Sequence, residues 1–355
     1  MSYLVIGEPA TVKEVMRRTA DFAPSNALTS VVPLAPATLR ILSKARFALP
    51  PVLASATGEE HRRVRKAVAG FFTPAKVEAV TPQVRGLTHH RLALTAAALD
   101  EGPVDLSLSL ARHVPPVIMA ELTGQDNPPL ADLKAWSQDS LELFWGWPSP
   151  ERQLELAGSA AEFYGWLRAE VLASRGKDSL FGVLLATGLS TAEVCSLGYF
   201  LVIAGQETTS QLINTALYRG IGLGAAGWAA LASTERASAH VRTVLATESS
   251  VHTWRRAAMH DTELNGVALP AGAEILLELS GRHAPDAPPT AYSLAFGHGL
   301  HRCLGAKLAE LETRIVVEEA AAALPELELF GPESQWLRLL SFQTPTSVMA
   351  TRGQQ

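Results

Sequence analysis

Apolar positions recur along most of the chain with the spacing of a single helix face. This period predicts helices over four stretches, which are residues 61–99 with a break at Pro74, residues 153–174, residues 190–220 and residues 306–324. Proline breaks the first stretch because it has no N–H for the helix ladder. The pattern therefore predicts a mainly helical protein.

The stretch 190–220 is the longest helical candidate. Ser190 and Glu193 have the spacing of a capping box, in which each side chain binds the backbone N–H of the other residue. The middle of this segment is apolar on nearly all sides. A helix with that pattern is expected to run through the interior of the protein.

Strand patterns are sparse. Residues 266–280 predict a hairpin whose turn is the sequence PAG, and residues 341–351 predict one more strand. Proline-rich patches at 126–129 and 284–289 predict loops. Because no linker divides the chain and no strand–helix alternation occurs, we expect one mainly α domain with small β-sheets over residues 1–355.

Composition narrows the class of protein further. The 355 residues are 47% hydrophobic and 18% charged, with a net charge of −5, which is typical of a soluble globular protein. The sequence has no basic domain of the kind that binds nucleic acid. It predicts neither a signal peptide nor a membrane span. Two cysteines, Cys195 and Cys303, give no disulfide framework, so we expect a cytoplasmic location.

Cys303 lies in the glycine-rich stretch AFGHGLHRCLG, residues 295–305, directly before a predicted helix. Backbone N–H groups and the helix dipole at such a position favour an anion, so we expect the thiol pKa to be lowered. The three glycines allow tight turns and the close approach of a large flat group. A buried structural cysteine beside a turn is the alternative interpretation.

The same stretch resembles the haem-binding loop of the cytochrome P-450 family, whose pattern is F-G-x-G-x-H-x-C-x-G. The matching residues are Phe296, Gly297, Gly299, His301, Cys303 and Gly305. The resemblance implies that Cys303 is the axial thiolate on the iron of haem b, iron protoporphyrin IX. It also implies that His301 binds a haem propionate and that Phe296 packs near the sulfur.

A second match lies in the predicted central helix, where AGQETT, Ala204 to Thr209, resembles the family's oxygen-activation motif. Glycine is unfavourable inside a helix, so Gly205 needs a reason. Close packing against a neighbour is one reason. The resemblance implies another, a local opening of the helix over the haem beside Ala204, with Glu207 and Thr208 as the acid and alcohol that relay protons.

Two further matches follow the family's order along the chain. His61 and Arg65 resemble H-x-x-x-R on a helix that contacts the haem propionates, and their spacing puts both on one helix face. Arg256 matches an arginine that also binds a propionate. The resemblance implies the family's fold, a triangular prism of helices with haem between the long central helix and the helix after the cysteine loop.

The chain departs from the family pattern in two places. Where the family has E-x-x-R before the predicted hairpin, this sequence has Thr243 and Ala246. The segment between the PAG turn and the cysteine loop is also short, and His283 with Pro285-Asp286 is its expected remnant. Loss of both sides of an ion-pair network is less costly than loss of one side, which would leave a buried charge unpaired.

Position along the chain indicates the substrate region. Candidate pocket residues are Phe144, Trp145 and Trp147, together with the central helix near Leu201 and Ala204, although aromatic residues also fill ordinary cores. A basic patch around the cysteine would suit an acidic ferredoxin. Its residues are Arg62, Arg63, Lys66, Arg302 and Lys307.

These observations predict a haem-thiolate monooxygenase that activates O2 and oxidises a small organic substrate, as in the tailoring of specialised metabolites. A ferredoxin and ferredoxin reductase are the expected electron donors. Two alternatives stay open. One is an atypical haem enzyme that uses peroxide, oxidative coupling or non-oxidative chemistry. The other is a haem-free binding scaffold on the same fold.

Overall fold

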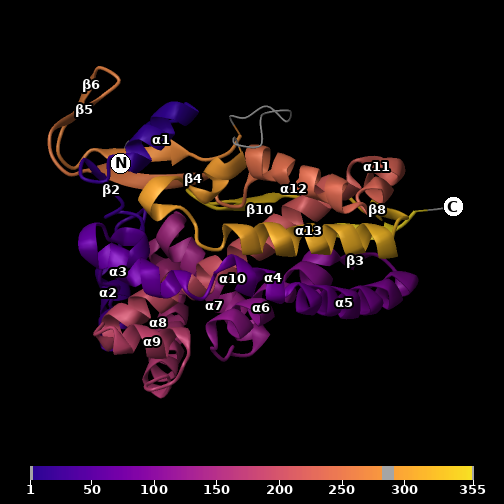
Figure 1. Cartoon of the computed structure of the whole chain (residues 1–355), viewed down its shortest axis with the longest axis horizontal. Helices are drawn as coiled ribbons and strands as arrows, with labels where there is room; N and C mark the ends of the chain where they lie inside the picture. Colours follow the sequence, from indigo (N-terminus) through magenta and orange to yellow (C-terminus); the bar gives the residue numbers. More distant parts are fainter. Residues whose placement is uncertain (1–2, 282–291, 354–355) are drawn as a thin grey trace.

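The computed structural model describes residues 3–281 and 292–353. Helices make up most of this part of the chain (Figure 1). The α-helices are α1 (Pro9–Arg17), α2 (Pro36–Lys44), α3 (Gly58–Ala69), α4 (Pro74–Ala79), α5 (Thr81–Glu101), α6 (Val114–Thr123), α7 (Leu130–Trp145), α8 (Pro150–Ala173), α9 (Leu180–Ala186), α10 (Thr191–Ile221), α11 (Gly224–Ala230), α12 (Thr234–Glu248) and α13 (Ala306–Ala323). Short irregular helical turns are η1 (Leu53–Ser55), η2 (Ser107–Ala111), η3 (Tyr292–Phe296) and η4 (Gly299–His301).

The strands are short and form small sheets. They are β1 (Leu4–Ile6), β2 (Phe22–Ala23), β3 (Val104–Asp105), β4 (Thr253–Ala258), β5 (Thr262–Leu264), β6 (Val267–Leu269), β7 (Glu274–Glu278), β8 (Leu327–Leu329), β9 (Trp336–Arg338), β10 (Gln343–Pro345) and β11 (Met349–Arg352). The sheet with the order β1-β7-β4-β2 lies at one end of the helical body. The prediction of a mainly α fold with small β-sheets is confirmed.

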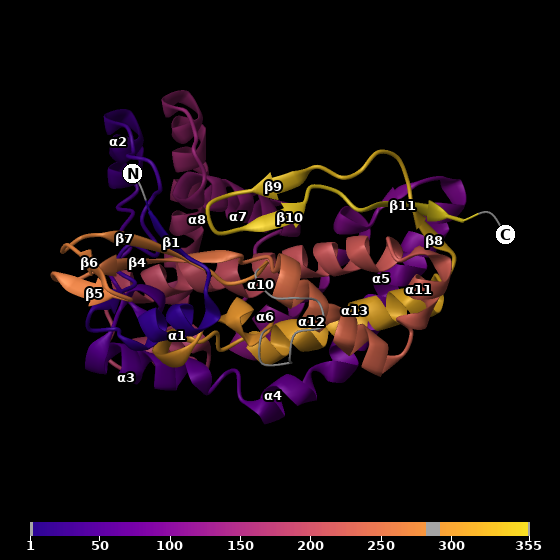
Figure 2. The same cartoon turned by 90° about the horizontal axis from the view of Figure 1, so that it is seen from above.

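Helix α10 crosses the interior (Figure 2) and packs against α6, α8, α12 and α13. Its start is fixed by the predicted capping box, in which the Ser190 hydroxyl accepts from the Glu193 N–H at 3.3 Å. In return, the Glu193 carboxylate accepts from the Ser190 N–H at 2.7 Å. Figure 1 shows α13 running beside α5, and these two helices share a large apolar core with α6, α10 and α12.

The four predicted helical stretches are confirmed as helical, with one break that was not predicted. Within 61–99, α3 ends at Ala69 and α4 begins at Pro74, as predicted, but a second break separates α4, which ends at Ala79, from α5, which begins at Thr81. The stretches 153–174, 190–220 and 306–324 correspond to α8, α10 and α13. The loop predicted at 126–129 is confirmed. The loop predicted at 284–289, and with it the expected remnant at His283 and Pro285-Asp286, lies outside the described residues.

The strand predictions were partly wrong. β6 and β7 do not pair across the PAG turn, because β6 pairs with β5 and β7 pairs with β4 and β1. The hairpin instead turns at Asn265-Gly266, whose φ values of 50° and 77° suit a tight two-residue turn. The single strand predicted over 341–351 is two strands, β10 and β11, in different sheets.

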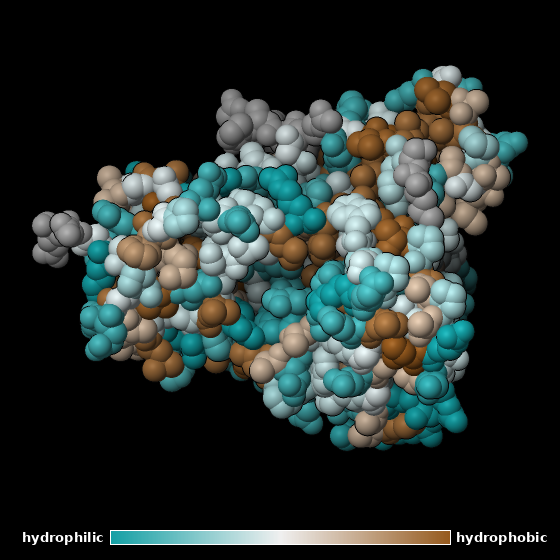
Figure 3. All heavy atoms as spheres, turned by 180° about the vertical axis from the view of Figure 1, so that it is seen from behind, coloured by the Kyte–Doolittle hydropathy of each residue, from teal (hydrophilic) through white to brown (hydrophobic). Residues whose placement is uncertain are grey.

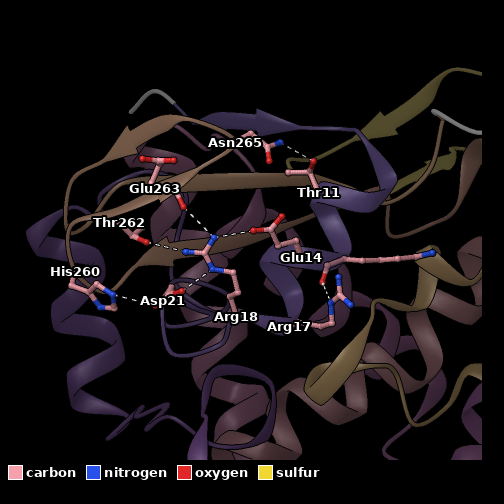
Figure 4. A network of polar contacts seen from close by, with 10 residues as sticks. Thr11, Glu14, Arg17, Arg18, Asp21, His260, Thr262, Glu263 and Asn265 are labelled. Carbon is pink, nitrogen blue, oxygen red and sulfur yellow. Dashed lines mark hydrogen bonds and ion pairs between the residues drawn. The ribbon is translucent and has the colours of Figure 1, made fainter.

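A polar network ties α1 to the β5–β6 hairpin (Figure 4). The Arg18 guanidinium donates to Glu14 at 2.9 Å, to Asp21 at 2.7 Å and to the Glu263 carbonyl oxygen at 3.1 Å. Hydrogen bonds to Asp21 and Glu14 raise the pKa of Arg18. This contact holds α1 in place, and α1 in turn supports the loop before α13 through η4.

Hydrophilic and hydrophobic residues are interspersed on the face shown in Figure 3. Large apolar side chains that are exposed, such as Leu39, Trp147 and Phe330, come from separate parts of the chain. Within residues 3–281 and 292–353, no helix has both the length and the apolar character needed to cross a membrane.

The capping box gives a direct test of how α10 is anchored. We expect Ser190→Ala to lower the free energy of unfolding by about 1 kcal/mol, because the first turn loses its side-chain acceptor. Urea denaturation measures the change. Ser233→Ala is the matched control, because Ser233 precedes α12 without a side-chain cap hydrogen bond. Equal losses in the two variants would contradict the assigned role of Ser190.

Candidate active site

A cavity of about 250 Å³ lies between α10 and the loop that precedes α13. It is lined by eleven of the twelve candidate site residues, which are His61, Arg65, Ala204, Gly205, Thr208, Arg256, Phe296, Gly297, His301, Cys303 and Gly305. Glu207 does not line it. The fold therefore brings segments from α3, α10, β4 and the cysteine loop to one place.

The cysteine loop has the backbone conformation that its glycines predict. Gly297 and Gly299 have φ values of 70° and 67°, which side chains with a Cβ rarely adopt. A Cβ on Gly299 would also stand 3.4 Å from the carbonyl oxygen of Met16 in α1. The Cys303 N–H donates to the Phe296 carbonyl oxygen at 2.8 Å and closes the loop. The sulfur is thereby presented to the cavity.

The pKa of the Cys303 thiol was predicted in the wrong direction. Burial raises this pKa, and the backbone N–H groups of Gly305 and Ala306 and the charges of Arg65 and Arg302 only partly oppose the effect. By accessible area the Cys303 side chain is nevertheless exposed. A metal cation bound at the sulfur would stabilise the thiolate, since a coordinating thiol loses its proton.

Four basic side chains surround the cavity near Cys303. His61 and His301 have ring centroids 4.6 Å apart, and Arg65 donates to the Arg302 carbonyl oxygen at 2.6 Å. Arg256 is 1% exposed and donates to the Arg255 carbonyl oxygen at 2.8 Å. Among the described residues, no salt bridge joins any of the four to a carboxylate. We call these four residues, His61, Arg65, Arg256 and His301, the basic ring.

Buried polar atoms of the basic ring lack hydrogen-bond partners. They are both ring nitrogens of His61, Nδ1 of His301 and Nε of Arg256. Burial lowers the pKa of Arg256 to about 10 and that of His301 to about 4. Such groups are costly unless an anion pairs with them. The ring therefore fits the carboxylates of haem, and Cys303 fits its iron.

Gly205 lies against the flexible side chain of Met119, which lines the same cavity. A Cβ at this position would stand 2.4 Å from the Cε atom of Met119 in α6. Helix α10 continues without interruption past Ala204, so the local opening that we expected is not present. The Thr208 hydroxyl, which lines the cavity, donates to the Ala204 carbonyl oxygen at 2.5 Å.

Glu207 points away from the cavity, into the protein interior. Its carboxylate accepts from Nζ of Lys134, in α7, at 3.0 Å, and both side chains are buried. Lys134 also donates to Ser210 at 3.0 Å and to Gln206. Adjacent residues of a helix point about 100° apart, so Glu207 and Thr208 face different surroundings. The structure does not bring the expected acid and alcohol together.

Sequence reasoning missed Lys134 and Glu312. Glu312 lies in α13 at 0% exposure, with both carboxyl oxygens without a hydrogen-bond partner. Burial raises its pKa to about 8, and the charge of Lys134 opposes this rise. A charged residue that follows the apolar period of α13 was the available signal, because it falls on the buried face.

The predicted aromatic pocket residues lie elsewhere. Phe144 and Trp145 are buried in the core, and Trp147 is 59% exposed; none of the three lines the cavity. Leu201 and Ala204 do line it, as predicted. The aromatic residues that line the cavity are Phe72, Phe200, Trp254, Phe296 and Phe342. Apart from Phe296, the sequence did not single them out.

Residues of the predicted basic patch lie at the surface. Arg62, Arg63, Lys66, Arg302 and Lys307 are all exposed. Arg62 pairs with Glu59 at 2.7 Å and Arg63 with Glu60 at 3.6 Å, so part of the patch charge is already compensated.

The positions aligned with E-x-x-R lie on α12. Thr243 donates its hydroxyl to the Ala239 carbonyl oxygen at 3.1 Å. Ala246 is buried, and its carbonyl oxygen accepts from the Gly281 N–H at 2.9 Å. Neither side chain carries charge, so an ion pair between these two positions is not possible.

Fold and site together define a mainly helical protein in which one cysteine and four basic side chains meet at a single cavity. The sequence is 30% identical over 308 residues to cytochrome P450 monooxygenase PikC of Streptomyces venezuelae, covering 81% of this chain and 72% of that protein. Erythromycin C-12 hydroxylase of Saccharopolyspora erythraea is 29% identical over 340 residues, with 90% and 81% covered. No model of a known protein family matches the sequence.

Solved structures agree with these relatives. Cytochrome P450 CREJ in complex with (4-ethylphenyl) dihydrogen phosphate has a TM-score of 0.91 at 28% identity, covering 99% of this chain and 92% of that one. The chain belongs to the cytochrome P450 family. It is a haem-dependent monooxygenase that acts with O2 and a redox partner on a small organic substrate.

The Lys134–Glu207 pair can be tested by a double-mutant cycle. We expect Lys134→Met to cost about 3–5 kcal/mol of stability, because the buried Glu207 carboxylate loses its counter-charge. Adding Glu207→Gln removes the stranded charge and should recover much of the loss. Urea denaturation of the two single variants and the double variant gives the coupling. Simple additivity would contradict a direct pair.

Proposed function

We propose that this P450 oxidises a small organic substrate during the tailoring of a specialised metabolite, with Cys303 as the axial haem ligand. The observation that carries the proposal is the meeting of Cys303 and the basic ring at one cavity. The names of the relatives support the tailoring role, among them mycinamicin IV hydroxylase/epoxidase of Micromonospora griseorubida at 28% identity. We propose that residues 1–355 act as a single domain.

Each side chain has a distinct part in this proposal. Haem, bound through the sulfur of Cys303, supplies the oxygen-activating chemistry. Arg65, Arg256 and the two histidines of the basic ring bind its carboxylates and fix its orientation. Phe296, Gly297 and Gly305 would form the surface beside the sulfur against which the porphyrin packs. On the α10 side of the cavity, Ala204 and Gly205 leave room for the porphyrin, because neither carries a long side chain.

Thr208 is the residue placed to handle protons. Its hydroxyl lines the cavity and donates to the Ala204 carbonyl oxygen, which leaves the oxygen lone pairs free to accept a hydrogen bond. Glu207 has a different part, because Lys134 holds its carboxylate in the interior. A proton taken up by the Glu207 carboxylate would have to pass from one side of α10 to another before it reached the Thr208 hydroxyl.

The electron donor in this proposal is a ferredoxin with its ferredoxin reductase. Support comes from the exposed side chains of Lys66, Arg302 and Lys307, which surround the loop that carries Cys303 and suit an acidic partner. We also place the protein in the cytoplasm. Support for that is the pair of free thiols, Cys195 and Cys303, which a reducing compartment maintains.

The difference spectrum of the reduced protein with carbon monoxide tests the axial ligand. We expect the strongly red-shifted Soret band of thiolate ligation, and its loss in Cys303→Ser with haem still bound by the basic ring. Cys195→Ser is the control, because Cys195 is buried near the start of α10, does not line the cavity and should leave the band unchanged. An unaltered band in Cys303→Ser would overturn the assignment.

The role of Thr208 predicts a change in coupling. We expect Thr208→Ala to divert electrons from product to peroxide or water, because the cavity loses the hydroxyl that positions protons. Product formed per NADPH consumed, with ferredoxin and its reductase, measures coupling. Thr215→Ala is the matched control, since Thr215 lies in the same helix, donates its hydroxyl to the Gln211 carbonyl oxygen at 3.1 Å and does not line the cavity. Equal coupling in wild type and Thr208→Ala, or full turnover with hydrogen peroxide alone, would contradict the role.

A further inference from the structure

The strand β4 presents alternate side chains to the cavity. Successive residues of a strand point to opposite faces, and accordingly Trp254 and Arg256 line the cavity whereas Thr253 and Arg255 do not. Arg255 is 2% exposed and donates to the Ala27 and Thr29 carbonyl oxygens on the other side. One short strand thus supplies both a member of the basic ring and an aromatic wall.

Three aromatic rings from distant segments meet at this wall. Trp254 has its ring centroid 6.1 Å from that of Phe200, in α10, and 6.2 Å from that of Phe342, which precedes β10. All three line the cavity. We call Phe200, Trp254 and Phe342 the aromatic corner.

The aromatic corner is held rigidly from behind. The Trp145 ring stacks on Trp254 at 6.3 Å with an interplanar angle of 29°, and it meets Phe342 edge-on at 5.0 Å. The Leu340 N–H donates to the Trp145 carbonyl oxygen at 2.8 Å. The Thr253 hydroxyl donates to the Leu340 carbonyl oxygen at 2.5 Å. A preformed surface binds a matching ligand at a smaller entropic cost.

Charge in the cavity is one-sided. The basic ring, His298 and Arg302 are the titratable side chains beside Cys303, and no Asp, Glu or Lys belongs to the described lining. The rest of the wall consists of aliphatic and aromatic side chains with a few hydroxyls, including those of Ser249 and Ser250. Once haem occupies the basic ring, the remaining described lining offers no acidic group, and its remaining basic side chains, His298 and Arg302, lie in the loop that carries Cys303.

We propose that the substrate is an uncharged, mainly apolar molecule whose flat unsaturated portion stacks in the aromatic corner against Trp254. This rests on the proposed function, in which haem takes up the charges of the basic ring. A carboxylate group would find the cations of the basic ring already paired and would lose its hydration without compensation. An ammonium group would find no carboxylate in the described lining, and the aromatic faces would offset only part of its lost hydration.

Four probes of similar size distinguish the effect of ligand charge on affinity from the effect of ligand planarity. They are 2-ethylnaphthalene, 2-naphthylacetate, (2-naphthylmethyl)trimethylammonium and 2-ethyldecahydronaphthalene. The quaternary ammonium is chosen because it cannot ligate iron. Dissociation constants come from equilibrium dialysis with the haem-loaded enzyme and from the Soret shift that substrate binding produces. We expect 2-naphthylacetate to bind at least about a hundredfold more weakly than 2-ethylnaphthalene. The quaternary ammonium should also bind more weakly, by a smaller factor because the aromatic faces attract it, and the saturated analogue should bind more weakly as well.

Trp254→Leu tests the aromatic corner itself. We expect it to weaken 2-ethylnaphthalene binding by roughly tenfold, because stacking on the indole is lost, and to bring the flat and saturated probes to similar affinities. Trp166→Leu is the matched control, since Trp166 packs near Phe163 and Trp136 and does not line the cavity. It should leave every dissociation constant unchanged.

Outcomes for the substrate and for the proposed function are separable. Equal binding of the ions and the neutral probe by wild type, or unchanged affinities in Trp254→Leu, would overturn the substrate class while the thiolate carbon monoxide band remains. Loss of that band in wild type would instead remove the proposed function. The panel with wild-type enzyme decides the question of charge even where Trp254→Leu does not fold.

Discussion

The arrangement of the active site depends on a set of basic side chains at one cavity that have no carboxylate partner in the described part of the protein. Arg256 is almost fully buried and, among the described residues, Arg65, His61 and His301 have no carboxylate beside them either. Isolated buried charges destabilise a fold. A ligand with its own carboxylates removes that cost, so haem binding and stability are coupled in this protein. The thiol of Cys303 is similar, because desolvation raises its pKa and a cation bound at the sulfur would lower it.

Helix α10 separates two environments. Residues spaced by three or four positions, such as Leu201, Ala204, Thr208 and Leu212, face the cavity. Glu207 and Ser210 instead bind Lys134 on another side of the helix. The helix therefore keeps a charged pair in the interior without placing it in the cavity. This arrangement leaves the hydroxyls of Thr208 and Thr209 as the proton-bearing side chains of the motif at the cavity.

The aromatic corner is a defined surface built from segments that are far apart in the chain and carry no recognisable motif. Phe200, Trp254 and Phe342 belong to α10, β4 and the approach to β10, and Trp145 at the end of α7 supports two of them. Dispersion and ring geometry favour such clusters wherever they form. Their meaning for the substrate comes from the absence of a carboxylate in the described lining.

The amino-acid sequence by itself determined the helices and the cysteine loop. The spacing of apolar residues, the capping residues and the spacing of glycines are local properties. Ser190, Pro74 and Gly297 therefore act as predicted, whatever tertiary contacts surround them. Strand pairing was beyond the sequence, because β6 and β7 each find partners outside the predicted hairpin. Only the tertiary structure decided that Glu207 binds Lys134 and that Trp254, not Trp147, lines the cavity. The physical reason is that side-chain surroundings depend on contacts between segments far apart in the chain, and no local pattern records these contacts.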